Sequence, residues 1–409
     1  MLVSLLGLKS TPFIILGVFF GILLILSAYT SSFNLSLLSE TLAQLDPQVV
    51  KYRNIQIDLS DNVTTNAQLT IPAIGKGPFP GVVLIPGSGP ADMNYTASNN
   101  SKLFWQIAQY LSERGFVVLK YDKRGIDDNA TVINKNLWGN STYDDLKQDA
   151  QKVVNVLINL PEVDSKKISM IGHSEGGEIV ARIATDNPTT KFDNIVLMAP
   201  RIEKPSDQIY YGLVTFPIEY AKQVLDKNHV GSFSLQEALQ DQLFLNMIGG
   251  NTSLISDKNI LEGTNLNKSA DKINKDRYVN IDTELRPVLE KRMEKVFEGS
   301  KCDNPIEGPC PIYLKSLLNL TSTLGIIDNV SSSTGIMILH GQNDSGSRVQ
   351  QALFLQQKLM ELKHPDHTLI TYPGLGHHFY PSTRWTTESG PIPDYVLADL
   401  YSWLELHSK

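Results

Sequence analysis

The feature that most constrains the fold is a series of short, continuous apolar runs that alternate with amphipathic stretches after about residue 51. Runs of this length are typical of parallel strands that are buried on both faces of a sheet. The amphipathic stretches favour helices that connect one strand to the next. The pattern predicts a mostly parallel sheet with helices on both faces. Its expected strands are Val82–Ile85, Phe116–Tyr121, Ile168–Ile171, Ile195–Met198, Ile336–Leu339 and Thr368–Tyr372.

Helix signals fill the spaces between these runs. Thr142 and Asp145 have the spacing of a capping box, and apolar residues then recur at helical intervals until Pro161. Strand-like runs are missing between Pro200 and about Val330. Two helices are expected there, one starting at Ser234 with apolar residues through Met247, the other from Asp282 to Phe297. We interpret residues 201–330 as a helical cap over a binding site; an unrelated helical appendage is the alternative.

Composition narrows the class of protein. The chain has 409 residues, 36 basic and 43 acidic side chains, a net charge of −7 and 42% hydrophobic residues. These values exclude a disordered chain and the basic footprint of a nucleic-acid-binding protein. Cys302 and Cys310 are the only cysteines, which excludes a disulfide scaffold and a four-cysteine zinc site. They could form one disulfide across a short loop.

The N-terminal segment has a different character. Residues 12–29 carry no charge, and at about 1.5 Å per residue such a helix is long enough to cross a bilayer. The sparse charges around it place the short end in the cytoplasm and the rest of the chain outside the cell. We expect a transmembrane anchor in residues 1–31 and a linker in 32–50; a cleaved secretory signal is the alternative.

Several Asn-x-Ser/Thr sequons are consistent with export and glycosylation, although each tripeptide is a weak signal alone. They begin at Asn34, Asn62, Asn94, Asn140, Asn251, Asn267, Asn319 and Asn329.

The most informative segment is ISMIGHSEGG, in which a strand-like run meets Ser174 and then a helical pattern. A tight strand-to-helix turn exposes a serine hydroxyl above the sheet edge, and glycines at 172 and 176 leave space for close backbone packing. The N–H of Glu175, at the helix start, would face the negative charge that develops when the hydroxyl attacks a carbonyl. The segment predicts a nucleophilic Ser174.

A serine nucleophile needs a histidine base and a carboxylate that aligns it. Asp344 follows the strand-like run Ile336–Leu339, and His377 follows Thr368–Tyr372 on a glycine-bearing loop. We therefore expect His377 to accept the proton of Ser174 and Asp344 to hold the imidazole. This chemistry requires neither a metal nor an organic cofactor.

These motifs together resemble the α/β-hydrolase superfamily in its esterase and serine-aminopeptidase-like branch. The resemblance rests on GHSEGG, ILHGQND, GLGHHF, LIPGSGP and YDKRG, and covers roughly residues 51–200 and 331–409, which would form the two parts of the core. It implies a second oxyanion donor in the Gly87-Ser88-Gly89 loop, the backbone N–H of Ser88. A glycine-flanked loop after a strand allows such close approach to a ligand.

Alternatives exist for several of these assignments. His378 could replace His377, and Asp328 could replace Asp344, although Asp328 does not follow a strand. For the segment with Asp122 and Arg124, the resemblance implies a structural turn braced by an Arg–carboxylate pair. His364 and His367 have metal-ligand spacing but no evident third ligand, and His173 suits a packing role.

The combined features predict an exported, membrane-anchored serine hydrolase that cleaves small-molecule carboxylic esters through an acyl-enzyme. A peptidase or amidase acting on small peptides differs mainly in its leaving group. A binding module that kept the fold and lost the chemistry is a third interpretation. No nucleic-acid partner is expected, and the oligomeric state is open.

Overall fold

The computed structural model describes residues 49–59, 63–97, 100–186, 192–248, 277–298, 310–386 and 388–408. The chain divides into two compact units, residues 1–49 and 50–409. The predicted anchor at residues 12–29 lies outside the described residues, as do Cys302 and the sequons at Asn34, Asn62, Asn251 and Asn267. Within the described ranges, no helix has both the length and the apolar character needed to span a bilayer.

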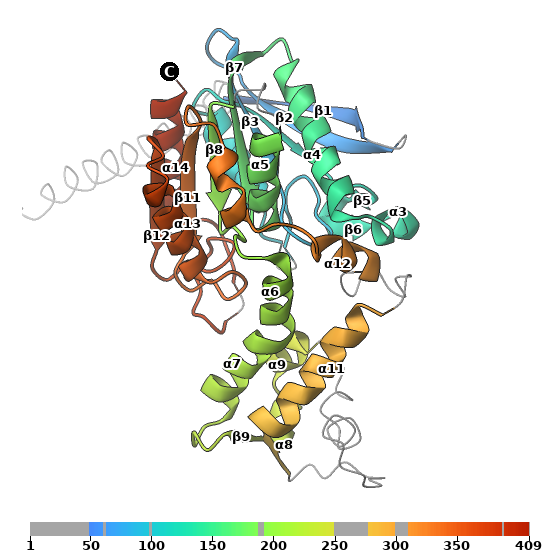
Figure 1. Ribbon diagram of the computed structural model, residues 1–409. Helices are drawn as coiled ribbons and strands as arrows, with labels where there is room; N and C mark the ends of the chain where they lie inside the picture. Colours follow the sequence, from blue (N-terminus) through green and yellow to red (C-terminus); the bar gives the residue numbers. More distant parts are fainter. Residues whose placement is uncertain are drawn as a thin grey trace, which may run out of the picture. The chain divides into compact units, whose positions relative to one another are not determined.

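An eight-stranded sheet forms the centre of the second unit, with the order β1-β2-β4-β3-β7-β8-β11-β12 (Figure 1). Strands β4, β3, β7, β8, β11 and β12 run parallel to one another, whereas β1 and β2 are antiparallel neighbours at one edge. The bounds are β1 Val50–Asp58, β2 Thr64–Pro72, β3 Phe79–Ile85, β4 Val117–Tyr121, β7 Val163–His173, β8 Asn194–Met198, β11 Gly335–Gly341 and β12 His367–Tyr372.

All the expected strands are confirmed, and they are the parallel ones. β1 and β2 were not predicted, because their sequences lack continuous apolar runs. In β2 the exposed Thr64 and Asn66 alternate with the buried Thr65 and Ala67, as in an antiparallel strand with one solvated face. Such alternation differs from the continuous apolar runs that indicate buried parallel strands.

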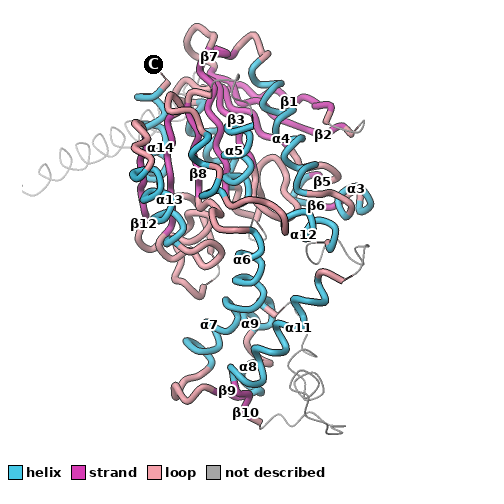
Figure 2. The backbone as a smooth tube through the Cα atoms, in the orientation of Figure 1, coloured by secondary structure: helices cyan, strands magenta, loops and turns pink. Residues whose placement is uncertain are grey.

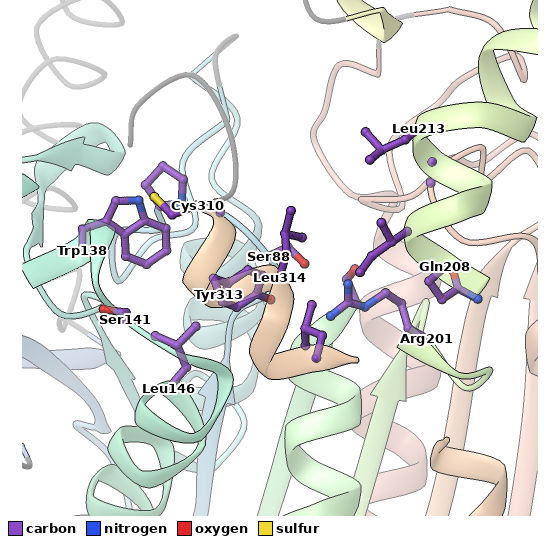
Figure 3. A pocket seen from close by; sticks show the side chains of 17 residues that line it. Ser88, Trp138, Ser141, Leu146, Arg201, Gln208, Leu213, Cys310, Tyr313 and Leu314 are labelled. Carbon is purple, nitrogen blue, oxygen red and sulfur yellow. The ribbon is translucent and has the colours of Figure 1, made fainter. Parts of the chain in front are cut away.

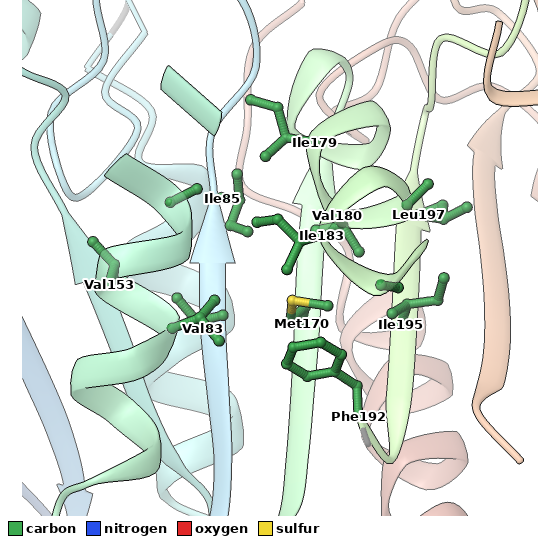
Figure 4. Packing of buried hydrophobic residues seen from close by; sticks show 14 of the residues in the cluster. Val83, Ile85, Val153, Met170, Ile179, Val180, Ile183, Phe192, Ile195 and Leu197 are labelled. Carbon is green, nitrogen blue, oxygen red and sulfur yellow. The ribbon is translucent and has the colours of Figure 1, made fainter. Parts of the chain in front are cut away.

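Helices cover both faces of the sheet (Figure 2). On one face, α4, α5 and α13 pack on alternate strand residues, and Figure 4 shows Val83, Met170 and Ile195 facing them. On the other face, α2 and α14 pack on the intervening residues Val82 and Val196. These helices are α2 Leu103–Ser112, α4 Tyr143–Ile158, α5 Glu175–Asp186, α13 Val349–Glu361 and α14 Asp394–His407. The doubly covered parallel sheet is thereby confirmed.

The capping box predicted for α4 is present. The Thr142 hydroxyl accepts a hydrogen bond from the Asp145 N–H at 3.2 Å, and the Asp145 carboxylate accepts one from the Thr142 N–H at 2.8 Å. Short elements precede this helix between β4 and α4: β5 Ile126–Asp127, η2 Asp128–Ala130, β6 Thr131–Val132 and α3 Lys135–Gly139.

The segment between β8 and β11 is mainly helical and has its own apolar cluster, which includes Val214, Phe233, Phe244 and Leu285. Trp385 of the core also packs against this cluster, with its ring centroid 5.5 Å from that of Phe216. The elements are α6 Pro205–Tyr210, η3 Tyr211–Thr215, α7 Phe216–Tyr220, η4 Ala221–Leu225, β9 Ser232–Ser234, α8 Leu235–Ala238, α9 Gln242–Met247, β10 Tyr278–Asn280, η6 Ile281–Leu285, α11 Arg286–Val296, α12 Pro311–Leu317, η7 Thr323–Gly325 and η8 Ile327–Asn329.

Two details of this segment differ from the expectation. The helix expected from Ser234 through Met247 is divided into α8 and α9, because the side chain of Asp241 accepts a hydrogen bond from the Phe244 N–H at 2.9 Å and starts a second helix. The segment also contains the antiparallel pair β9 and β10. Three-residue strands are too short to leave a periodic signal.

The turn after β4 is braced by a buried ion pair. Arg124 donates two hydrogen bonds to the carboxylate of Asp149 on α4, each 2.6 Å long, and the two side chains are only 4% and 3% exposed. This is the Arg–carboxylate brace expected for the YDKRG segment. A bidentate pair of this kind fixes geometry as well as charge.

We predict that Arg124→Met lowers the free energy of unfolding by about 3–5 kcal/mol, because the Asp149 carboxylate stays buried without its cation. Arg53→Met is the matched control: Arg53 pairs with Glu162 at 2.5 Å, but its side chain is 42% exposed. Loss of that pair should cost no more than about 1 kcal/mol. Urea unfolding of the full chain measures both values; equal losses would contradict the structural role of Arg124.

Candidate active site

Ser174 occupies the turn between β7 and α5. Its φ is +55°, a left-handed conformation that costs a non-glycine residue about 1–3 kcal/mol and is typical of residues at functional sites. Glycines allow the turn to pack closely. A Cβ at Gly172 would lie 2.2 Å from the carbonyl oxygen of Gly176, and one at Gly176 would lie 2.0 Å from that of Ile85. Neither position can hold a side chain.

Asp344 and His377 are in direct contact. The Nδ1 atom of His377 lies 2.7 Å from Oδ2 of Asp344, and Oδ1 of Asp344 accepts hydrogen bonds from the N–H groups of Gly346 and Ser347, each at 2.8 Å. Asp344 lies just beyond β11, and His377 lies in the loop after β12, which pairs with β11. Adjacent parallel strands thus bring the two residues together from sequence positions far apart.

The loop after β3 packs against the serine. A Cβ at Gly87 would lie 2.9 Å from Cβ of Ser174, so a glycine is required for this approach. Gly89 has a φ of +85°, which also favours glycine. Ser88 lies between them, and its hydroxyl donates to Glu175 Oε2 at 3.0 Å. Glu175 is the first residue of α5, where a backbone N–H has no partner within the helix.

A pocket of about 490 Å³ opens at this site. Figure 3 shows Ser88 and Tyr313 near its centre, Trp138 and Leu146 on one side, and Arg201 and Gln208 on the other. Ser174 and Gly346 line it too, and a Cβ at Gly346 would lie 3.3 Å from Cγ of His377. The serine and the surroundings of the imidazole therefore border one pocket, between core elements and α6, η3 and α12.

Comparisons with known proteins agree with the fold. The family model described as serine aminopeptidase, S33, matches residues 97–247, which include Ser174. The solved structure of a proline iminopeptidase from Mycobacterium smegmatis superimposes with a TM-score of 0.51 over 87% of this chain and 99% of that chain, at 15% sequence identity. The chain has an α/β-hydrolase fold.

Two curated relatives add to this result. Esterase EstD of Thermotoga maritima is 34% identical over 161 residues, which are 37% of this chain and 35% of the relative. Esterase FrsA of Yersinia enterocolitica is 26% identical over 140 residues, which are 33% of this chain and 29% of the relative. The chain thus spans about a third of the length of each curated relative. The family match and the relatives agree with the esterase and serine-aminopeptidase-like branch.

Asp344 and His377 each shift the pKa of the other. Burial acts to lower the pKa of His377, but the charge of Asp344 and its hydrogen bond to the imidazole prevail and raise it above the ordinary value. Burial acts to raise the pKa of Asp344, but His377 and His340 hold it well below its usual range. Asp344 therefore stays ionised, and its negative charge makes the imidazole of His377 more basic.

Further groups hold the His377 loop: Glu388, to which the sequence gave no role, and His173, for which it suggested a packing role. Glu388 accepts hydrogen bonds from the N–H groups of His377 and His378. Nε2 of the fully buried His173 lies 2.8 Å from the carbonyl oxygen of His377. Burial, together with His377 and His378, holds the pKa of His173 well below its usual value, so its neutral ring donates from Nε2. Glu388 left no pattern in the sequence.

The sequence also gave no role to the side chain of Glu175, which is completely buried. Its Oε2 accepts hydrogen bonds from Ser88, from Arg201 at 2.7 Å and from the hydroxyl of Tyr313 on α12. Lys123 lies 3.8 Å from the other oxygen and donates to the carbonyl oxygens of Gly87 and Gly89. These contacts fix both ends of the Ser88 loop. Lys123 belongs to the YDKRG motif, and that motif was the sequence signal that could have identified its role.

The alternative residues lie elsewhere. His378 faces Glu388 at 3.3 Å, and Asp328 is exposed on η8 with no recorded contact to His377. Nδ1 of His367 lies 2.8 Å from the carbonyl oxygen of His364, and the described residues contain no cluster of three or more metal-ligating side chains. Cys310 is disulfide-bonded and lines the pocket. Because Cys302 lies outside the described residues, the pairing of the two cysteines stays a prediction.

The raised pKa of His377 predicts the pH dependence of the reaction of Ser174 with a fluorophosphonate probe. A base works only when neutral, so the rate should rise with pH through a midpoint above about 6.5. Asp344→Asn removes the charge that raises this pKa; the midpoint should move to lower pH and the rate should fall roughly a thousandfold or more. Asp328→Asn is the control and should change neither. Inactivation rates measured between about pH 5 and pH 9 test this; an unmoved midpoint in Asp344→Asn would contradict the pairing.

Proposed function

We propose that this α/β-hydrolase is a serine hydrolase that cleaves carboxylic esters through an acyl-enzyme. The observation that carries the proposal is the pairing of His377 with Asp344 beside a pocket lined by Ser174. The curated relatives named esterases support the reaction class.

Each residue has a defined role in the proposed reaction. His377 takes the proton from the Ser174 hydroxyl as its oxygen attacks the ester carbonyl, and the N–H groups of Ser88 and Glu175 stabilise the oxyanion. The intermediate collapses when His377 gives the proton to the leaving alcohol. Water then attacks the acyl-enzyme with the same base, and the acid is released. Asp344 stabilises the imidazolium in both halves.

Two other functions use the same residues. A peptidase or amidase would need His377 to protonate an amine leaving group, and the name of the matched family favours this candidate. A binding module would need no chemistry; the left-handed turn at Ser174, the ion-paired His377 and the glycine loop at residues 87–89 support a catalytic site instead. Esterase activity is therefore the preferred proposal.

The cellular location is a separate proposal. The uncharged stretch at residues 12–29 supports a membrane anchor that leaves the hydrolase outside the cell, and the sequons agree with a glycosylated, exported chain. A cleaved signal would export the same domain without the anchor.

We predict that a fluorophosphonate probe labels the full-length protein at Ser174, and that Ser174→Ala abolishes both labelling and ester turnover. Ser141→Ala is the matched control, because Ser141 lines the same pocket, while its hydroxyl bonds only to the carbonyl oxygen of Leu137, at 2.7 Å. This variant should keep both activities. Peptide mapping of the labelled protein identifies the site; undiminished labelling of Ser174→Ala would refute the proposed nucleophile.

A second prediction concerns the oxyanion loop. Lys123→Met removes the donor that holds the carbonyl oxygens on both sides of Ser88, so kcat should fall by about tenfold to a hundredfold with little change in KM. Lys120→Met is a closely matched control: Lys120 is equally buried, but it bonds to Asn94.

Both lysine variants should lose stability, and only Lys123→Met should lose kcat beyond the fraction that is unfolded. Kinetics combined with thermal unfolding separate the two effects. Equal kcat values for the two folded variants would remove Lys123 from the oxyanion site.

A further inference from the structure

We infer that the pocket selects esters whose acyl group is uncharged and apolar, and that it rejects acyl groups that carry a free α-ammonium. This inference rests on the proposed function and names its substrate class. It also separates the chain from the aminopeptidase activity in the name of the matched family.

The walls of the pocket are mainly apolar. They come from α3 and α4 of the core and from α6, η3 and α12 of the insertion. Apolar side chains on both sides of Ser88 give a bound chain hydrophobic contact over most of its length (Figure 3). The large apolar side chains are Trp138, Leu146, Ile209, Leu213, Leu314 and Leu317.

Charge in the pocket has one sign. Among the described residues that line it, Arg201 is the only charged side chain, and no carboxylate is present. Arg201 pairs with Glu175 at 2.7 Å and with Glu178 at 3.6 Å, but the side chains of these two carboxylates are only 0% and 3% exposed, and neither lines the pocket. The oxygen of Glu175 that faces Arg201 also accepts hydrogen bonds from Ser88 and Tyr313.

An aminoacyl substrate would be disfavoured here for two reasons. Its α-ammonium would leave water for a wall whose described side chains include no carboxylate, and an unpaired buried charge is costly. The guanidinium of Arg201 would offer the ammonium only hydrogen-bond donors. An acyl group of the same shape with hydrogen in place of the ammonium avoids both costs.

The test compares two ethyl esters that differ only in this group, leucine ethyl ester and ethyl 4-methylpentanoate. An α-amino group has a pKa of about 7.7–8.0, so leucine ethyl ester is charged near pH 6.5 and neutral near pH 9. With full-length protein we expect kcat/KM to favour the 4-methylpentanoate by roughly tenfold or more at the lower pH, and this ratio to shrink at the higher pH. The ratio cancels the pH dependence of the enzyme.

Two variants test whether charge is the cause. Ser141 lines the pocket on the side away from Arg201. Ser141→Asp places a carboxylate there and should narrow the ratio at the lower pH, whereas the isosteric Ser141→Asn should leave it near the wild-type value.

The outcomes are distinct. If 4-nitrophenyl acetate and ethyl 4-methylpentanoate are both left intact, the proposed function fails and this inference with it. If 4-nitrophenyl acetate is hydrolysed but leucine ethyl ester reacts as fast as its partner, only the inference fails. A ratio that does not change with pH, or that responds equally to Ser141→Asp and Ser141→Asn, also overturns it, because shape would then set the preference.

Discussion

The contact between Gly176 and the end of β3 is the constraint on which the site depends. Because a Cβ at Gly176 would lie 2.0 Å from the carbonyl oxygen of Ile85, α5 starts against the strand that leads into the Ser88 loop. That approach sets the Glu175 N–H close to the loop and forces Ser174 into its left-handed conformation. The conformational cost of about 1–3 kcal/mol is met by the buried packing of β7 and α5 in the core.

A second constraint is electrostatic. Glu175 joins three parts of the chain that are distant in sequence: the Ser88 loop, Arg201 after β8, and Tyr313 on α12. Lys123 completes the arrangement from the turn after β4. Buried charges are costly unless each is paired and hydrogen-bonded, so they tolerate few alternative arrangements. We interpret this network as the reason that the donors of the proposed oxyanion site can be held in place before a substrate binds, which electrostatic stabilisation requires.

The sequence predicted the parts of the molecule that have local patterns. Buried parallel strands such as Ile195–Met198 are continuous apolar runs, and the cap of α4 is a short polar motif, so both could be predicted from the sequence. Lys123 and Tyr313 escaped prediction because their partners are distant in sequence. Glu388 is only eleven and ten residues from its partners His377 and His378, but its own neighbours show no periodic pattern. The boundary between α8 and α9 was not predicted for a different reason. The apolar periodicity continues across it, but the side chain of Asp241 caps a new helix there.

The core and the insertion contribute different properties to the site. Ser174, Asp344 and His377 all lie at or just beyond the ends of core strands. The insertion supplies Leu213, Leu314 and Leu317, and thus much of the apolar wall that an acyl group would contact. The family match over residues 97–247 includes Ser174 and the first part of the insertion, whereas Asp344, His377 and α12 lie beyond it. The hydrogen bond from Tyr313 to Glu175 links the insertion to the core. Helix α12, which lines the pocket, thereby bonds to the carboxylate that holds the Ser88 loop.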